Sequence, residues 1–160
     1  MQHPLQISRK IDYGLRAMVF LASMPGGEVI PFREIARRMD VPEEFLAKIL
    51  KVLVGKKLVH STRGARGGYR LARPAAEISM LDVIEAVEGP VRVNVCQDNH
   101  DACRISHSCT MYGVWKLGQE RMLEVYRSAR LDGLAMTEAS RVDPRPFPRP
   151  GAPPRAQGTM

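Results

Sequence analysis

The chain has 160 residues, of which 44% are apolar and 26% are charged, and its formal net charge is +7. These values fit one compact domain of ordinary size with a hydrophobic core. No window approaches 18 uncharged apolar residues, and the N-terminal segment lacks the apolar core of a signal peptide, so neither a transmembrane helix nor export is expected. We therefore expect a cytoplasmic protein with three reduced cysteines.

Basic residues are concentrated in the first half of the chain. Residues 1–75 hold 14 Lys and Arg against 6 Asp and Glu, whereas residues 76–140 hold 6 against 10. This division favours a surface that meets phosphate groups, although a solvated basic face without a partner would give the same counts. Residues 141–160 hold six of the twelve prolines and no apolar periodicity, so a disordered tail is expected there.

Three helices are predicted in the first half. The first spans residues 7–23, where apolar side chains recur at helical spacing and Ser8 lies near the N-cap. The second spans about 31–39 and the third about 42–54, and each has a proline near its start. A short turn at Asp40-Val41 separates the second helix from the third.

The third helix has two different faces. Phe45, Leu46 and Ile49 are expected to be buried against the first two helices. Lys48 and Lys51 lie on the other face, where they are free to enter a major groove of DNA.

Residues 57–73 predict two short strands around a glycine-rich tip that carries Arg63 and Arg66. Glycine allows a sharp turn and a close approach to a phosphate, and arginine suits a narrow, electronegative minor groove. The tip alone could be only a tight turn. Together with the helices it predicts a mainly α fold with a small β-wing, a winged helix-turn-helix domain over residues 1–75.

The second half predicts a helix over about 79–87, opened by a capping-box-like pair, Ser79 and Asp82, and a linking segment, residues 76–109, with a loop over 91–109. A long amphipathic helix is predicted over 110–131, within a dimerisation segment of residues 110–140. Its apolar stripe is hard to bury in a chain with a small core, so a homodimer is expected. The stripe consists of Met111, Val114, Gly118, Met122, Val125 and Ala129.

All three cysteines, Cys96, Cys103 and Cys109, fall in that loop. Their wide spacing differs from the close cysteine pairs of zinc knuckles. It could wrap three thiolates around a larger object such as an iron–sulfur cluster. Three unligated cysteines, or a redox pair, remain alternatives on spacing alone.

The order of elements resembles the IscR/NsrR-type (Rrf-type) winged helix-turn-helix transcription regulators over about residues 5–135. The resemblance is carried by EIA at 34–36, LAKIL at 46–50, RGARGGYRLA at 63–72, and SMLDVIEAVEG at 79–89 before the cysteine loop and the tryptophan-bearing helix. It implies a homodimer, a double-stranded DNA operator, and a cluster that sets DNA affinity, with [4Fe–4S] favoured and [2Fe–2S] possible. It implies neither an enzyme nor a small-molecule substrate.

Three cysteines leave one cluster ligand to be supplied. Tyr112 stands where the cluster-assembly branch of this family has a histidine. The nitric-oxide-sensing branch uses an aspartate on the first helix of the partner subunit, and Asp12 matches that position. Asp12 could instead be a surface carboxylate paired with Arg16, and His100 and His107 in the loop are further candidate donors.

The leading hypothesis is a DNA-binding regulator, with repression favoured, whose cluster senses nitric oxide, iron or redox state. The alternative is a winged-helix regulator with zinc-bound or unligated redox cysteines. A cysteine-dependent enzyme is not expected, because no oxyanion or substrate-binding motif accompanies the cysteines. The operator preference of the cluster-assembly branch is not transferred, because Ala47 replaces its recognition-helix glutamate.

Overall fold

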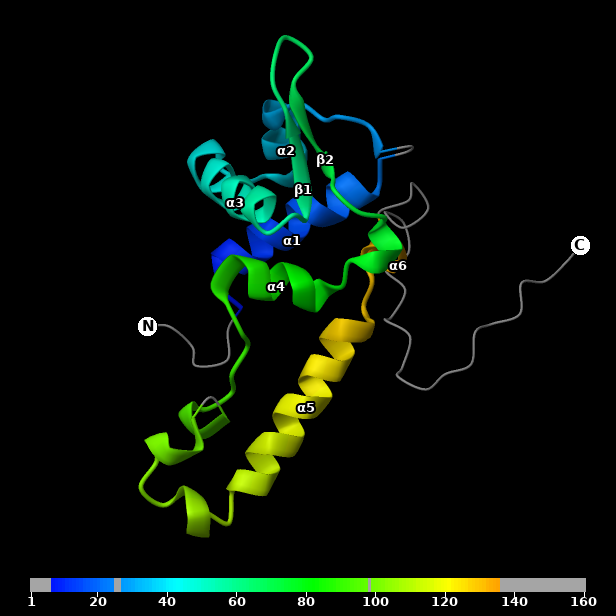
Figure 1. Ribbon diagram of the computed structural model, residues 1–160. Helices are drawn as coiled ribbons and strands as arrows, with labels where there is room; N and C mark the ends of the chain where they lie inside the picture. The colour runs from blue at the N-terminus through cyan, green and yellow to red at the C-terminus, as the bar shows by residue number, and fades with distance from the viewer. Residues whose placement is uncertain (1–6, 25–26, 98, 136–160) are drawn as a thin grey trace, which may run out of the picture.

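The computed structural model describes residues 7–24, 27–97 and 99–135, so the expected disordered tail, 141–160, lies outside the described residues. The elements, shown in Figure 1, are α1 (Arg9–Ala22), α2 (Phe32–Met39), α3 (Glu43–Gly55), β1 (Val59–Thr62), β2 (Gly68–Leu71), η2 (Ala75–Glu77), α4 (Met80–Glu88), η3 (Val95–Gln97), η4 (His100–Ala102), η5 (Ser106–Ser108), α5 (Tyr112–Ser128) and α6 (Leu131–Leu134). The predicted mainly α fold with a small β-wing is confirmed.

The first three helices enclose one hydrophobic core. Ser8 caps α1 as predicted, with its Oγ accepting a hydrogen bond from the backbone N–H of Ile11 at 3.2 Å. Between α2 and α3 the chain turns through Asp40, which adopts a left-handed conformation with φ 51° and ψ 51°. The next residue, Val41, is buried. This tight, anchored turn fixes α3 across α2, as a helix-turn-helix requires.

The prediction for Phe45 was wrong. Leu46 and Ile49 are buried under α1, but the Phe45 side chain is 47% exposed. Its ring lies beside that of Tyr13 on α1, with centroids 6.2 Å apart. The buried face of α3 is formed by Leu46, Ile49, Leu50 and Leu53. Phe45 lies at the edge of that face, so its ring packs against a neighbouring ring instead of entering the core.

The wing is an antiparallel hairpin in which Thr62 pairs with Gly68 and Val59 pairs with Leu71. Ile30, in the segment before α2, adds an isolated bridge to β2 through two hydrogen bonds with Tyr69, both 2.9 Å. Gly68 allows this approach, because a Cβ built there would lie 2.3 Å from the Ile30 carbonyl oxygen. The bridge therefore ties the wing to the start of the helix-turn-helix.

We expect Gly68→Ala to lower the free energy of unfolding by about 1–3 kcal/mol, the usual cost of forcing an atom into a filled site. The clash is with backbone, so the bridge to Ile30 must open. Gly55→Ala is the matched control, because a Cβ at Gly55 meets no heavy atom within 4 Å. Thermal unfolding of both variants tests this, and equal melting temperatures would contradict the close approach.

α4 links the winged-helix core to the second half. Its predicted capping box is present: the Ser79 hydroxyl accepts from the Asp82 N–H at 3.1 Å, and the Asp82 carboxylate accepts from the Ser79 N–H at 2.7 Å. Val83, Ile84 and Val87 are buried against the same core as α1 and α3.

The long helix, predicted over 110–131, runs from Tyr112 to Ser128 in the structure. It ends because Ala129 and Arg130 become extended and pair with the start of α4. Met80 N–H donates to the Ala129 carbonyl at 2.7 Å, and Leu131 N–H donates to that of Ile78 at 2.9 Å. Leu131, which begins α6, is fully buried in the core.

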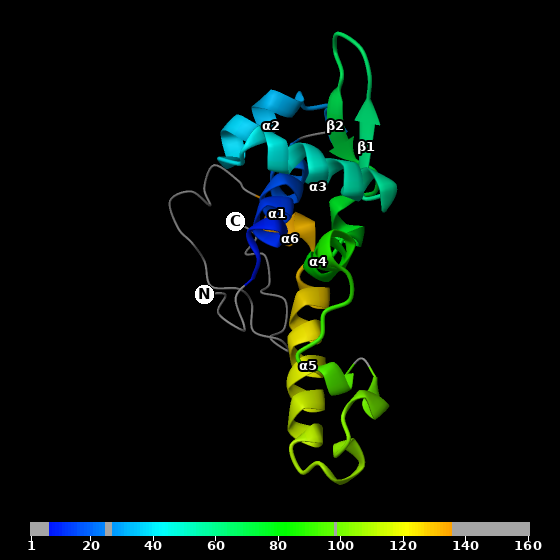
Figure 2. The ribbon, with the colours of Figure 1, turned by 90° about the vertical axis from the view of Figure 1, so that its left-hand side faces the viewer.

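α5 and the segment between α4 and α5 form an arm that projects from the winged-helix body. In Figures 1 and 2 the wing lies at one end of the molecule, and the segment with the cysteines lies at the opposite end, beside the start of α5. None of the helices in the described ranges has the length and apolar character needed to cross a membrane.

Candidate nucleic-acid interface and cysteine loop

The four basic side chains predicted to bind DNA are all exposed. Lys48 and Lys51 lie on α3, and Arg63 and Arg66 lie between the two wing strands. In Figure 1 the hairpin rises beside α3, so these four exposed cations lie on two neighbouring elements, called here the basic edge. A helix with a flanking hairpin of this kind can contact a major groove and the adjacent minor groove together.

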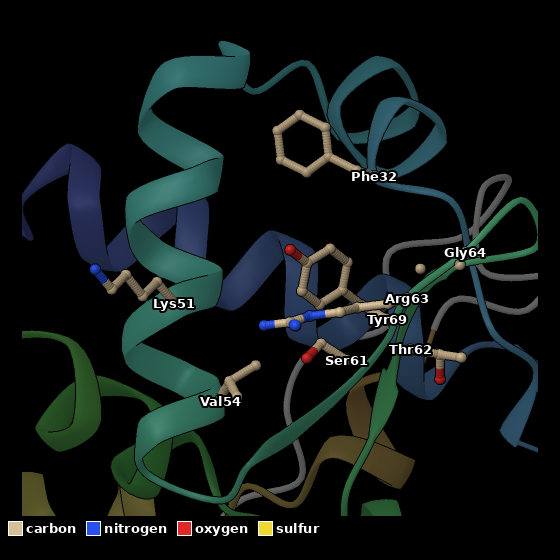
Figure 3. Close-up of a pocket in the computed structure, with 10 residues that line it drawn as sticks. Phe32, Lys51, Val54, Ser61, Thr62, Arg63, Gly64 and Tyr69 are labelled. Carbon is tan, nitrogen blue, oxygen red and sulfur yellow. The ribbon is translucent and has the colours of Figure 1, made fainter.

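A groove of about 440 Å³ separates α3 from the wing. It is lined by Lys51 and Val54 from α3, Phe32 from α2, and Arg63 and Tyr69 from the hairpin. Figure 3 shows the Arg63 side chain reaching from the hairpin towards α3, beside the Tyr69 ring. Arg63 therefore lies between α3 and the wing, whereas Arg66 belongs to the tip itself.

Sequence reasoning did not single out two further exposed cations of the helix-turn-helix. Arg33 and Arg37 are exposed on α2, the helix that crosses the DNA backbone in helix-turn-helix complexes. The signal was present in the sequence, because α2 carries three arginines in eight residues. These side chains suit phosphate contacts, which position a protein on DNA without reading its sequence.

The three cysteines are free, half-buried thiols in the segment between α4 and α5, called here the cysteine loop (residues 91–109). Cys96 lies in η3, and Cys103 and Cys109 follow η4 and η5 directly. The loop is fastened to α5 by a 2.9 Å hydrogen bond from the Val93 N–H to the Gln119 Oε1 atom. Gln97 Nε2 donates to the Cys96 sulfur at 3.8 Å.

The donor set of the loop is soft, and thiolates are the donors that iron–sulfur clusters use. Among the described residues, however, no three His, Cys, Asp or Glu side chains are placed to hold a single metal ion. A cluster is larger than one ion, and two features of the loop bear on whether it could hold one. The first is the set of three thiol donors. The second is the buried hydroxyl of Ser106, which has no hydrogen-bond partner among the described residues. Both fit a group held within the loop.

The structure does not bring Asp12 to the cysteine loop of its own chain. The Asp12 carboxylate pairs with the Arg16 guanidinium at 2.7 Å, on the exposed surface of α1. α1 and the cysteine loop lie well apart in both ribbon views (Figures 1 and 2). In the loop, His107 lies 3.3 Å from Asp101, and Tyr112 is the first residue of α5.

α5 carries no buried residue. Val114 is 70% exposed, and Met111, Trp115 and Leu117 are also exposed. Of the predicted stripe, Met122 and Val125 are half-buried, whereas Ala129 is buried beyond the end of the helix. Exposed apolar side chains on a projecting helix make it a candidate interaction surface.

Comparison with known proteins places these features in a family. Residues 7–137 match the Rrf2 family, described as "Iron-dependent Transcriptional regulator". A Mycobacterium tuberculosis protein (strain H37Rv) named as an HTH-type transcriptional regulator is 42% identical over 87 residues, 54% of this chain and 54% of that protein. The chain thus spans about half the length of the curated relatives that it matches.

Three solved structures share the fold. CymR, titled the global cysteine regulator of B. subtilis, is 32% identical with a TM-score of 0.69, covering 82% of this chain and 96% of that one. IscR of T. potens is 31% identical with a TM-score of 0.66, covering 81% and 85%. An oxidized form of Staphylococcus aureus CymR is 28% identical with a TM-score of 0.64, covering 83% and 98%.

Proposed function

Since this chain belongs to the Rrf2 family of transcriptional regulators, we propose that it binds an operator in double-stranded DNA as a homodimer and represses transcription in the cytoplasm. We further propose that an iron–sulfur cluster in its cysteine loop, with [4Fe–4S] favoured, makes binding respond to nitric oxide, iron or redox state. The observation that carries DNA binding is the exposed basic edge formed by α3 and the wing.

Each element of that edge has a part in operator binding. Lys48 and Lys51 project from α3, the recognition helix, towards the major groove. Arg66 at the wing tip reaches the minor groove, and Arg63 lies in the groove between the wing and α3. The cations on α2, α3 and the wing neutralise phosphates, which supplies affinity that falls as salt rises.

The homodimer follows from α5. An isolated arm with Val114, Trp115 and Leu117 exposed leaves apolar surface in water, and a second copy of the same helix covers it by two-fold symmetry. Such a pairing also sets the distance between the two recognition helices, and hence the spacing of the operator half-sites.

We expect the double variant Val114→Glu, Met122→Glu to be monomeric, because four carboxylates would then meet in one apolar interface. The monomer should also lose tight operator binding, since it holds only one recognition helix. The control carries Lys116→Glu and Arg127→Glu, charge reversals at exposed positions off the predicted stripe. Sedimentation equilibrium measures the oligomeric state of both proteins. A double variant that sediments like the wild type would contradict the assignment of the α5 stripe as the dimer interface.

Cys96, Cys103 and Cys109 would hold the cluster, and Asp12 of the partner subunit would supply the remaining ligand. A cluster held by three thiolates has one iron bound to a harder, weaker donor, and that iron is the most open to exchange or attack by a signal. Asp12 could act as this ligand because its carboxylate is exposed on α1 and can be reached by another subunit. Within its own chain this carboxylate pairs with Arg16.

The arm offers a route from the cysteine loop to the DNA-binding face. The loop joins α4 to α5, and α4 packs on both α1 and α3. A change in loop conformation therefore acts on α4 at one end and on the dimer helix at the other. Either displacement alters the position of α3 relative to its copy across the dimer, which changes operator affinity.

A second function is a regulator with zinc-bound or unligated redox cysteines, and two observations favour its unligated form. The thiols of the described loop are free and not gathered around one point. A similar structure, 28% identical, is titled as the oxidized form of CymR. In this scheme, oxidation of the thiols would alter the loop without a metal.

One experiment separates the two functions. The protein is purified without oxygen, and its visible spectrum, iron, sulfide and zinc contents, and operator affinity are measured together. A brown protein with matched iron and sulfide, whose operator affinity changes when the cluster is removed, supports the cluster. A colourless protein with stoichiometric zinc, or with none and thiol-dependent binding, supports the second function.

A further inference from the structure

Ser106 lies between the second and third cysteines and is nearly inaccessible, with 5% of its surface exposed. Its Oγ atom has no hydrogen-bond partner, and across the described residues it is the sole buried side-chain polar atom in that condition. A buried hydroxyl without a partner is unfavourable, because it has lost its hydrogen bonds to water and makes none within the protein. Such an atom in the middle of a candidate cofactor loop needs an explanation.

The backbone of Ser106 is already engaged with both neighbouring cysteines. Its N–H donates to the Cys103 carbonyl at 3.1 Å, and its carbonyl accepts from the Cys109 N–H at 3.4 Å. These two bonds link the backbone of Ser106 to the cysteines that precede and follow it in the sequence. The unmet hydrogen-bonding capacity therefore belongs to the side chain alone.

Two other serines show that this condition is specific to Ser106. Ser108 lies in the same turn, but it is exposed and its hydroxyl donates to the Ile105 carbonyl at 3.4 Å. Ser79 is as deeply buried, but its hydroxyl is engaged in the capping box of α4. Burial without a partner thus coincides with the position between the cysteines.

We infer that the Ser106 hydroxyl donates a hydrogen bond to a sulfur of the iron–sulfur cluster held by the cysteine loop. This inference rests on the proposed function. Cluster sulfides and cysteine thiolates carry negative charge and accept hydrogen bonds, and the buried site excludes competing water. Ser106 is then a positioning residue that supports the cluster without ligating iron.

The bond has an electronic consequence. A donor to a cluster sulfur stabilises the reduced state more than the oxidised state, because the reduced cluster carries more negative charge. Ser106 therefore raises the reduction potential of the cluster and slows its loss. In the apoprotein the same hydroxyl has no acceptor and opposes folding.

Ser106→Ala separates these two effects, because they have opposite signs. The apoprotein of the variant should melt at or above the temperature of the wild-type apoprotein, since an unsatisfied polar atom is gone. The cluster-loaded variant should have a reduction potential more negative than that of the wild type. Its cluster should also be lost several times faster to excess iron chelator. Ser108→Ala is the matched control, with wild-type behaviour expected in all three measurements.

Two results would overturn the inference while leaving the proposed function intact. One is a Ser106→Ala apoprotein that melts clearly below the wild type, which would give the hydroxyl a stabilising partner without the cluster. The other is a loaded variant whose potential and cluster lifetime equal those of the wild type. A wild-type protein that assembles no cluster from iron and sulfide overturns the proposed function itself, and this is seen before any variant is compared.

Discussion

Replacing Arg63 or Arg66 by alanine is expected to lower operator affinity about 60-fold at 0.1 M salt, taking the wild-type and variant affinities as equal at 1 M salt. Each substitution removes two cations from the dimer, and each neutralised phosphate contributes about 0.9 to the slope of log K against log salt. If the wild-type dimer neutralises about 6–8 phosphates, its slope should be about −5 to −7, and each variant should be shallower by about 2. Binding titrations at several salt concentrations measure both quantities.

The two variants should differ in their dependence on DNA sequence. Arg66 belongs to the wing tip, so Arg66→Ala should lose most affinity at sites with a narrow A·T minor groove. Arg63 lies in the groove between the wing and α3, so its loss should weaken binding more evenly. Arg127→Ala, at an exposed position of α5, is the control. Unchanged affinity and salt slope in both wing variants would remove the wing from the interface.

Substituting any one of Cys96, Cys103 and Cys109 by alanine is expected to abolish cluster assembly. Two thiolates cannot replace three, because the iron left without its thiolate would be exposed to water and lost. The winged-helix body should remain folded, since all three thiols lie in the arm and none belongs to the hydrophobic core. Iron and sulfide content after anaerobic reconstitution measures assembly, and operator binding shows its effect on function.

Asp12→Ala should preserve the dimer but give a cluster with an altered spectrum or a shorter lifetime. Arg16→Ala is a matched control, because it removes the same 2.7 Å surface ion pair and leaves the carboxylate in place. The pair itself stabilises α1 by only about 0.5 kcal/mol, so neither variant should unfold. A wild-type cluster in Asp12→Ala, together with failed assembly in His107→Ala, would place the remaining ligand inside the loop.

Local signals in the sequence identified most elements of the fold. Ser8 before α1 and the Ser79–Asp82 pair before α4 are helix starts defined by residues close in sequence, and both were predicted. The glycines of the wing were also informative, because the hairpin needs them where backbones meet, as Gly68 meets Ile30. Such features depend on short-range geometry, which a single sequence records directly.

The predictions failed where tertiary contacts decide the outcome. Phe45 continues the apolar period of α3, but periodicity does not reveal that its ring stays at the edge of the buried face and meets Tyr13. Ala129 likewise continues the stripe of α5, yet the chain leaves the helix there to pair with the start of α4. In both cases a partner distant in sequence sets the conformation.

For the candidate site, residue types gave the chemistry but not the arrangement. The cysteines and basic residues are recognisable by kind and spacing. The direction of Arg63, into the groove beside Tyr69, depends on how the hairpin leans on α3. Ser106 could not be singled out at all, because a serine in a polar loop is expected at the surface until its burial is known.

The pairing of Ser79 with Arg130 gives the molecule a modular boundary. The segment that runs through α4, the cysteine loop and α5 begins at Met80 and ends at Ala129, and a 2.7 Å backbone hydrogen bond joins these two residues. Because the two ends of this segment are joined, residues can be inserted into the distal part of the arm without separating them, and the entropy of loop closure grows only slowly with length. Sensory loops of different length could thus be exchanged on one DNA-binding body. In each case α6 would anchor the end of the arm to that body, because Leu131 is buried in the core.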